Sequence, residues 1–352
     1  MSEQSDKPAG DTAEIATSVD KQSSGRRGGF VPRVSIGLPV YNGESFLEQA
    51  LDSLLSQTYK DFELIISDNA STDHTEQICR AYAARDHRIR YCRNNTNRGA
   101  AWNFNRVFKL ARGEYFKWAA HDDLCAPEFL QVCVSAMDRD PGIVLCYSWT
   151  QMVDVEGRPQ RNYQSPINLL GSPRSYERFR GAVCQDPYCC YEVFGLVRTS
   201  VLRQTPLIGH YTGSDAMLLA DLALLGRFHE VPSYLFFNRD HPNRSINAYS
   251  HEFLHVWFDP KLEGKITLRF WRWLWEYRRS VVRSSLSRRE RLRCYPALFS
   301  WVRKNFKQLA VDFRVAGMLL LRRISPRTGE LVSRIVHEGP RALFGTTNGL
   351  QR

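Results

Sequence analysis

Short apolar runs and amphipathic helical segments alternate along the first part of the chain. Residues 34–40 form an apolar run that ends in a Tyr-Asn-Gly turn, and residues 62–67 form a second apolar run. Between them, residues 45–57 place Phe, Leu and Ala at helical spacing. The same alternation predicts helices at 75–84 and 100–111 and strands at 89–92 and 114–119. This order predicts an α/β domain with a mostly parallel, Rossmann-like sheet flanked by helices.

The alternation continues beyond residue 140 in a less regular form. Apolar runs predict strands at 143–147, 193–197 and 228–237, and helical spacing predicts helices at 176–183 and 216–225. A segment rich in Pro, Gly and Ser, residues 162–175, is expected to be a connection. The pattern ends near Ser250, so we expect residues 30–250 to form one domain.

The two ends of the chain have a different composition. Residues 1–29 contain almost no apolar side chains, which predicts a disordered tail without a signal peptide. Residues 251–352 are expected to form a basic, aromatic-rich helical region, in which Trp271, Trp273 and Trp275 open an amphipathic helix. No apolar run approaches the roughly 20 residues that span a bilayer, so no transmembrane helix is expected.

Positive charge is concentrated near the C-terminus. The whole chain has a formal net charge of +11, and residues 261–330 contain 18 Lys or Arg against 5 Asp or Glu. Such a segment suits either docking on an anionic membrane surface or a solvated basic helical bundle, and composition does not choose between them. The nine cysteines contain no C-x-x-C pair, which favours a reducing cytoplasm over a disulfide framework or a zinc ribbon. We therefore expect a cytoplasmic protein, with peripheral attachment to the inner face of the cell membrane as an option.

Three polar segments follow predicted strands, at residues 39–43, 68–73 and 121–123. Ligands of parallel sheets bind beyond the carboxyl ends of the strands, so these segments are expected to meet at one edge. Asp122 and Asp123 in the third segment suit a divalent cation, Mg²⁺ or Mn²⁺, that neutralises a leaving diphosphate. An isolated Asp-Asp pair is more often a turn or a helix cap, and its place after a predicted strand favours the metal.

Other candidate residues each have an ordinary structural alternative. Tyr41 and Asp68 can stack on a nucleotide base and accept its N–H, yet they also suit strand-end packing and a turn. Asp215 can take the proton of an acceptor hydroxyl, although Gly213-Ser-Asp215 is also a good helix N-terminus. His241 can complete a metal shell or contact a diphosphate, with Arg239 or Arg244 adding charge, or it can be a surface loop histidine.

Together, residues 34–42, 57–73, 97–99 and 121–123 resemble the family 2 glycosyltransferases in the order and spacing of four motifs. The resemblance covers about residues 33–245. It implies a GT-A fold and inverting transfer from a nucleoside diphosphate sugar. It also implies site roles, with nucleotide-sugar contacts at Pro39, Tyr41, Asn42, Asp68, Asn97, Arg98 and Asp122, metal contacts at Asp123 and His241, and a catalytic base at Asp215.

Two departures from the family pattern refine this expectation. Ser214 stands where the family usually has an acidic residue before the base. The Gln-x-x-Arg-Trp motif of processive synthases is absent, because residues 222–227 read Leu-Ala-Leu-Leu-Gly-Arg. We therefore expect a non-processive enzyme that adds one sugar to a glycan or lipid-linked acceptor, in cell-surface polysaccharide or glycoconjugate synthesis.

Two other classes of protein share some of these features. A nucleotidyltransferase acting on sugar phosphates should carry a Gly-rich phosphate loop after its first strand, which residues 39–43 do not provide. A nucleic-acid binding protein would explain the basic C-terminal third but not the ordered acidic motifs before it. Nucleic acid is therefore an unlikely partner.

Overall fold

The computed structural model describes residues 31–165, 169–184, 189–242, 244 and 251–324. The expected disordered tail, residues 1–29, lies outside the described residues, as does the end of the basic C-terminal region. All the helices and strands below belong to one compact unit that begins at Pro32.

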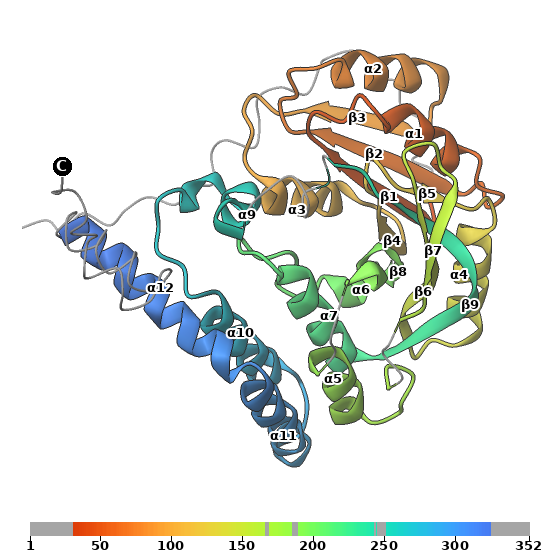
Figure 1. Ribbon diagram of the computed structural model, residues 1–352. Helices are drawn as coiled ribbons and strands as arrows, with labels where there is room; N and C mark the ends of the chain where they lie inside the picture. Colours follow the sequence, from red (N-terminus) through yellow and green to blue (C-terminus); the bar gives the residue numbers. More distant parts are fainter. Residues whose placement is uncertain (1–30, 166–168, 185–188, 243, 245–250, 325–352) are drawn as a thin grey trace, which may run out of the picture. The chain divides into compact units, whose positions relative to one another are not determined.

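Nine strands form a single mixed sheet (Figure 1). Its first part is parallel, in the order β3-β2-β1-β4, with β1 (Val34–Val40), β2 (Phe62–Asp68), β3 (Ile89–Arg93) and β4 (Tyr115–Trp118). Its second part continues from β4 in the order β8-β6-β9-β5, with β7 as an extra partner of β6. These strands are β5 (Leu124–Cys125), β6 (Ile143–Val153), β7 (Pro159–Tyr163), β8 (Leu196–Arg198) and β9 (Arg227–Arg239).

Helices pack against both faces of the sheet. Strand β1 directs Ile36 and Leu38 into one core cluster, which holds buried residues of α1 (Leu47–Leu55), α2 (Thr75–Arg85) and α4 (Phe129–Arg139). Strand β4 directs Phe116 and Trp118 into the other cluster. That cluster includes buried residues of α3 (Ala100–Leu110), α5 (Ser175–Val183) and α7 (Ser214–Leu225). Successive side chains of a strand point to opposite faces, which explains how one sheet supports two cores.

The C-terminal helices pack on the second core cluster. They are α9 (His251–Phe258), α10 (Arg269–Arg283), α11 (Arg288–Lys304) and α12 (Phe306–Ile324), shown in blue-green to blue in Figure 1. Tyr277 and Val281 of α10, and Cys294 and Trp301 of α11, are buried in the same cluster as the side chains of α5 and α7. Helix α11 begins with a capping box in which Ser287 and Glu290 exchange hydrogen bonds.

The structure confirms the predicted mostly parallel sheet flanked by helices and the helical C-terminal extension. The predicted strand at 193–197 is wrong in its first half, because η1 (Tyr191–Phe194) is a 3₁₀ helix and β8 begins only at Leu196. Gly195 ends that helix, and a side chain there would lie 2.6 Å from the Cys146 carbonyl oxygen. The expected connection at 162–175 starts too early, because residues 162 and 163 still belong to β7, where they pair with β6. A four-residue helix, α6 (Thr199–Leu202), and η2 (Pro260–Leu262) complete the fold.

Within the described residues no helix is both long enough and apolar enough to cross a bilayer. All nine cysteines are described, and none forms a disulfide.

Candidate active site

The three polar segments meet at the carboxyl edge of the parallel strands. The Asn42 backbone N–H donates to Ser71 Oγ at 2.9 Å, and Asn42 Oδ1 accepts from the Thr72 N–H at 2.9 Å. A side chain at Gly43 would lie 2.7 Å from the His121 ring, so the third segment packs against the first. The expectation that these segments come together is therefore confirmed.

Asp68 ends β2 with a fully buried carboxylate that already has partners. Its Oδ1 accepts from the Ser71 N–H at 2.8 Å, and its Oδ2 accepts from the Tyr91 hydroxyl at 2.8 Å. Pro39, near the end of β1, is also buried, whereas Tyr41 beyond it is 39% exposed. The Tyr41 ring is therefore accessible for stacking, and a base N–H would share the Asp68 carboxylate with Tyr91.

Asn97 and Arg98 are tied to the end of β2 through Asn69. The Asn69 Nδ2 donates to Asn97 Oδ1 at 2.8 Å, and the Arg98 N–H donates to Asn69 Oδ1 at 3.1 Å. The Arg98 guanidinium lies 4.3 Å from the centroid of the Trp102 ring. Both side chains thus lie at the same sheet edge as Asp68. Asn69 was not among the sequence candidates, although it stands directly after Asp68.

The acidic pair lies between β4 and β5, opposite the end of β9. Asp123 is buried, and its Oδ1 accepts from Asn238 Nδ2 at 2.9 Å and from the Arg239 N–H at 3.0 Å. Asp122 Oδ2 lies 3.0 Å from Nε2 of His241, which is also buried. The imidazole therefore contacts Asp122, and the two carboxylates have different partners.

The pKa values of the two carboxyls are shifted in opposite directions. Burial and the adjacent Asp122 charge raise the pKa of Asp123 to about 8. Burial opposes ionisation of Asp122 as well, but His121 and His241 outweigh it and lower the pKa of that carboxyl. The pair therefore holds one proton more tightly than two separate carboxylates would, and a bound cation would displace that proton.

The donor set of this cluster fits a small divalent cation. Asp122 and Asp123 offer carboxylate oxygens, which are the ligands that Mg²⁺ and Mn²⁺ prefer, and His241 adds an imidazole nitrogen beside them. No three His, Cys, Asp or Glu side chains in the described part of the chain are grouped so that they alone could hold a metal ion. Such a cation would therefore take its remaining ligands from a bound diphosphate and water, as Mg²⁺ commonly does.

Arg239 fixes the acidic loop in place. Its side chain is fully buried, and Nε donates to the Asp122 carbonyl at 3.0 Å. One terminal nitrogen donates to the Val155 carbonyl at 2.7 Å, and the other donates to Gln49 Oε1 at 2.8 Å. The guanidinium thus joins β9, the acidic loop, the end of β6 and α1. Because all three guanidinium nitrogens bond to other groups of the protein, Arg239 is suited to position the loop rather than to bind a phosphate.

Phe46 lies between the Arg239 guanidinium and the His241 ring. The Arg239 guanidinium lies 4.7 Å from the Phe46 ring centroid, and the Phe46 and His241 rings lie 4.7 Å apart. The roles of Phe46 and Gln49 could not be predicted from the sequence, because both belong to the predicted helix at 45–57 and resemble ordinary helix residues.

Arg244 supplies positive charge beside the acidic pair. It is half-buried, and one terminal nitrogen donates to Asn238 Oδ1 at 2.9 Å. Burial works against its charge, but Tyr191 and Asp123 outweigh it and raise the pKa of the guanidinium. Of the two arginines considered for the diphosphate, Arg244 is thus the one that faces the acidic pair.

Asp215 lies in the first turn of α7, after Gly213 in a left-handed conformation with φ 82°. Its Oδ1 accepts from the Ala216 N–H at 3.0 Å, and burial raises its pKa above the ordinary value. The Trp273 Nε1 of α10 donates to the Thr212 carbonyl at 2.7 Å, just before this turn. A carboxylate with raised proton affinity is suited to act as a general base.

Comparisons with known proteins agree with this architecture. Residues 35–205 match the model of "Glycosyl transferase family 2". An uncharacterised glycosyltransferase of Rickettsia typhi is 29% identical over 180 residues, which are 49% of this chain and 55% of that protein. The chondroitin synthase of Escherichia coli is 32% identical over 138 residues, which are 39% of this chain and 20% of that protein. The chain therefore matches about half, or less, of the length of these relatives.

The fold also matches a solved structure. Residues 1–349 of S. aureus TarS, crystallised in complex with UDP-GlcNAc, superpose with a TM-score of 0.57. The match covers 88% of this chain and 89% of that one at 16% sequence identity, so it supports the fold alone. With the matched motifs, the sheet order and the acidic pair at its edge, the chain carries a glycosyl transferase family 2 domain of the GT-A fold.

Proposed function

We propose that this protein is an inverting glycosyltransferase. It moves one sugar from a nucleoside diphosphate sugar to a hydroxyl of a glycan or lipid-linked acceptor. The observation that carries this proposal is the contact of Asp122 with His241 beside the buried Asp123, at the edge of a family 2 domain.

The donor nucleotide lies across the ends of β1, β2 and β3. Tyr41 stacks on the base, and Asp68 accepts its N–H beside the Tyr91 hydroxyl. The side chains of Pro39, Asn42, Asn97 and Arg98 line the same edge. Asp122 contacts the ribose or the donor sugar, and Arg244 adds charge near the diphosphate.

Asp123 and His241 hold the divalent cation, Mg²⁺ or Mn²⁺, together with the diphosphate. When bound, this ion neutralises the charge that develops on the leaving diphosphate. Asn238 and the Arg239 backbone keep one Asp123 oxygen fixed, which leaves its other oxygen to face the ligand.

Asp215 takes the proton of the acceptor hydroxyl. The acceptor oxygen forms a bond to the anomeric carbon while the bond from that carbon to the diphosphate oxygen breaks on the opposite face. The proton goes to the Asp215 carboxylate, whose raised pKa favours this transfer. Ser214 does not add the second carboxylate that this position usually has in the family, so Asp215 acts alone.

The acceptor is a cell-surface polysaccharide or glycoconjugate. The relatives named above include a polysaccharide synthase, and the structural neighbour TarS was crystallised with UDP-GlcNAc. The nine cysteines form no disulfide, as is usual in a reducing compartment, so the enzyme is proposed to work in the cytoplasm, at the inner face of the membrane.

Two variants separate the proposed roles. Asp123→Ala should abolish metal-dependent donor binding, whereas Asp215→Asn should keep donor binding and remove sugar transfer. A thermal-shift screen of UDP, GDP and dTDP sugars with Mn²⁺ or Mg²⁺ identifies the donor, and calorimetry with that donor measures both variants. Comparable loss of donor affinity in the two variants would contradict the assignment.

A further inference from the structure

Helix α11 is apolar on two opposite sides. Cys294, Leu298 and Trp301 are buried against the rest of the protein. On the other side, Leu292 is 68% exposed and Phe299 is 73% exposed, two turns apart on one helix face. A soluble helix normally keeps that outer side polar, so this face is an unusual feature of the surface.

Helix α12 repeats the feature. Phe306, Phe313 and Leu320 are all exposed, and their spacing of seven residues places them on one side of the helix. Asp312 accepts from the Phe270 N–H at 2.6 Å and so fastens the helix to the start of α10. After Asp312, no described residue from 313 to 321 is buried. Residues 313–321 of α12 are thus mostly apolar, and no element among the described residues buries them.

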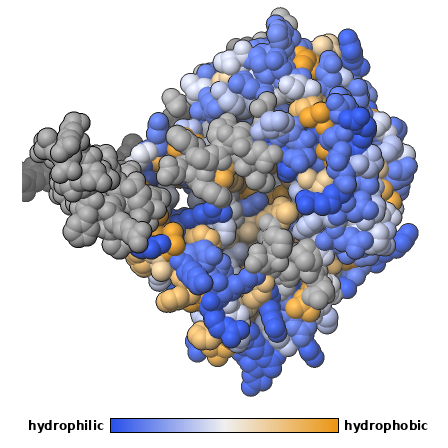
Figure 2. Space-filling model, viewed as in Figure 1, coloured by the Kyte–Doolittle hydropathy of each residue, from blue (hydrophilic) through white to orange (hydrophobic). Residues whose placement is uncertain are grey.

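Positive charge accompanies both apolar faces. Arg289, Arg303, Lys307 and Arg314 are exposed and form no ion pair with any residue that the structure describes. Figure 2 shows apolar residues among hydrophilic ones on the lower left, where Figure 1 places the C-terminal helices.

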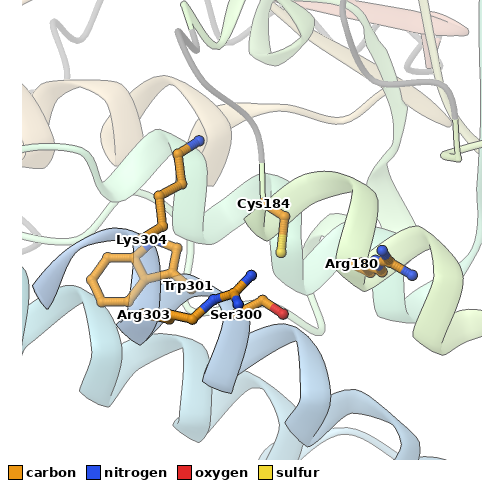
Figure 3. A pocket seen from close by; sticks show the side chains of 6 residues that line it. All are labelled: Arg180, Cys184, Ser300, Trp301, Arg303 and Lys304. Atoms are coloured by element: carbon orange, nitrogen blue, oxygen red, sulfur yellow. The ribbon is translucent and has the colours of Figure 1, made fainter.

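An open hollow of about 460 Å³ adds to this basic character. Figure 3 shows the six residues that line it, which are Arg180, Cys184, Ser300, Trp301, Arg303 and Lys304. Three of the six are cationic, and Ser300 adds a hydroxyl. The hollow lies at the end of α11 and contains none of the residues assigned to the donor, so it can accept an anionic headgroup independently of the donor.

We propose that α11 and α12 form a docking surface for an anionic lipid bilayer. Exposed Leu and Phe side chains enter the boundary of the acyl chains, and the Arg and Lys side chains contact the lipid phosphates. A second copy of the chain is a poorer occupant, because two such basic faces would repel each other. The Trp271 ring contacts the Phe313 ring with 5.0 Å between centroids, and tryptophan is enriched at membrane interfaces.

The docking surface is connected to the proposed catalytic base. Helix α10 lies between them, since Tyr277 packs in one core cluster with Trp301 of α11, and Trp273 contacts the turn before Asp215. This inference rests on the proposed function in one respect, namely that a lipid-linked acceptor would meet the site on a docked enzyme.

The test is vesicle co-sedimentation of the full chain. We expect binding to phosphatidylglycerol vesicles, weakened by added salt, and little binding to phosphatidylcholine vesicles. The triple variant Leu292→Ser, Phe299→Ser, Phe306→Ser should bind at least tenfold more weakly. The triple variant Arg289→Gln, Arg303→Gln, Lys307→Gln should bind roughly 100-fold more weakly, because each cation near the surface contributes about a fivefold factor.

Val155→Ser is the control, because Val155 is an exposed apolar residue in the turn between β6 and β7 and should leave vesicle binding unchanged. Only its backbone carbonyl, which the substitution keeps, contacts Arg239. Circular dichroism and donor-induced thermal shifts establish that each variant is folded and still binds nucleotide sugar. Equal binding to both vesicle types, or unchanged binding of both triple variants, would overturn the inference.

Two further outcomes are distinguishable. A second copy of the chain covers this face instead if the native chain does not bind vesicles and is an oligomer in ultracentrifugation, while the apolar triple variant is a monomer. If vesicle binding holds but no nucleotide sugar shifts the melting temperature, the docking surface stands and the proposed function fails.

Discussion

Asp122 Oδ2 and His241 Nε2 lie 3.0 Å apart, although 119 residues separate them in the chain. The contact joins the loop after β4 to the loop after β9, and it exists only because β5 pairs antiparallel with β9. The imidazole is therefore held at the acidic pair by the sheet itself, which makes it a fixed part of the site.

Replacing this histidine tests its role in metal binding. His241→Ala should weaken Mn²⁺-dependent donor binding by about 10- to 100-fold, as loss of residues close to a metal typically does. Calorimetry with and without Mn²⁺ measures the effect. His229→Ala is the control, because His229 is an exposed histidine on the same strand β9 and should bind the donor normally. Equal affinities of the two variants would remove His241 from the metal site.

The raised pKa of Asp123 predicts how stability depends on pH without metal. The ordinary pKa of this carboxyl is 3.8, and burial beside Asp122 raises it to about 8 in the folded protein. The folded state therefore holds a proton that the unfolded state releases, so stability is lost as pH rises from about 4 to about 8.

Urea unfolding in EDTA measures this loss. Asp123→Asn removes the titrating group and should stabilise the protein at pH 8 by on the order of 5 kcal/mol, with little effect at pH 4. A constant difference between the two proteins at both pH values would show that Asp123 does not titrate in this range.

Two glycines with nearly the same positive φ distinguish the cost of backbone strain from the cost of a steric clash. Gly213 has φ +82° and a side chain there would collide with the Trp273 ring, whereas Gly157 has φ +84° and open space around it. Gly157→Ala should cost about 1 kcal/mol of unfolding free energy, and Gly213→Ala about 3 kcal/mol. Gly213→Ala should also slow sugar transfer, because the collision displaces the turn that carries Asp215.

Arg239 is expected to be a stabilising residue as well as a positioning one. Arg239→Ala leaves the Asp122 and Val155 carbonyls without their buried donor and should lower the unfolding free energy by about 3 kcal/mol. Chemical denaturation measures this, with the exposed Arg203→Ala as control. If Arg239→Ala and the control have the same free energy of unfolding, the hydrogen bonds of Arg239 contribute little to stability.

The sequence predicted the parts of the site that depend on local pattern. Apolar runs identify where β1, β2 and β4 end, and the polar segments after them necessarily meet, since parallel strands share one carboxyl edge. Asp122 and Asp123 could be singled out for that reason. Their roles, and those of Asp215 and the nucleotide contacts, stay predictions until the variants above are measured.

The sequence could not predict the residues that hold the acidic pair. Asn238 and Arg239 reach Asp123 across 115 and 116 residues, through a pairing between a two-residue strand and a long one. A strand of two residues has no periodicity to detect, and one buried arginine cannot be distinguished from the many exposed ones by type. The 3₁₀ helix at Tyr191–Phe194 was missed because its apolar content equals that of a short strand.

The bond between Arg239 and Gln49 has a consequence for biosynthesis, since it closes a loop of 190 residues. Contacts so distant in sequence form late, and during translation the segment from Gln49 onward leaves the ribosome long before Arg239 is made. A nascent chain that stops before β9 therefore has the surface of the nucleotide pocket but no rigid acidic loop. Metal-dependent donor binding is therefore expected to begin only when β9 has emerged from the ribosome.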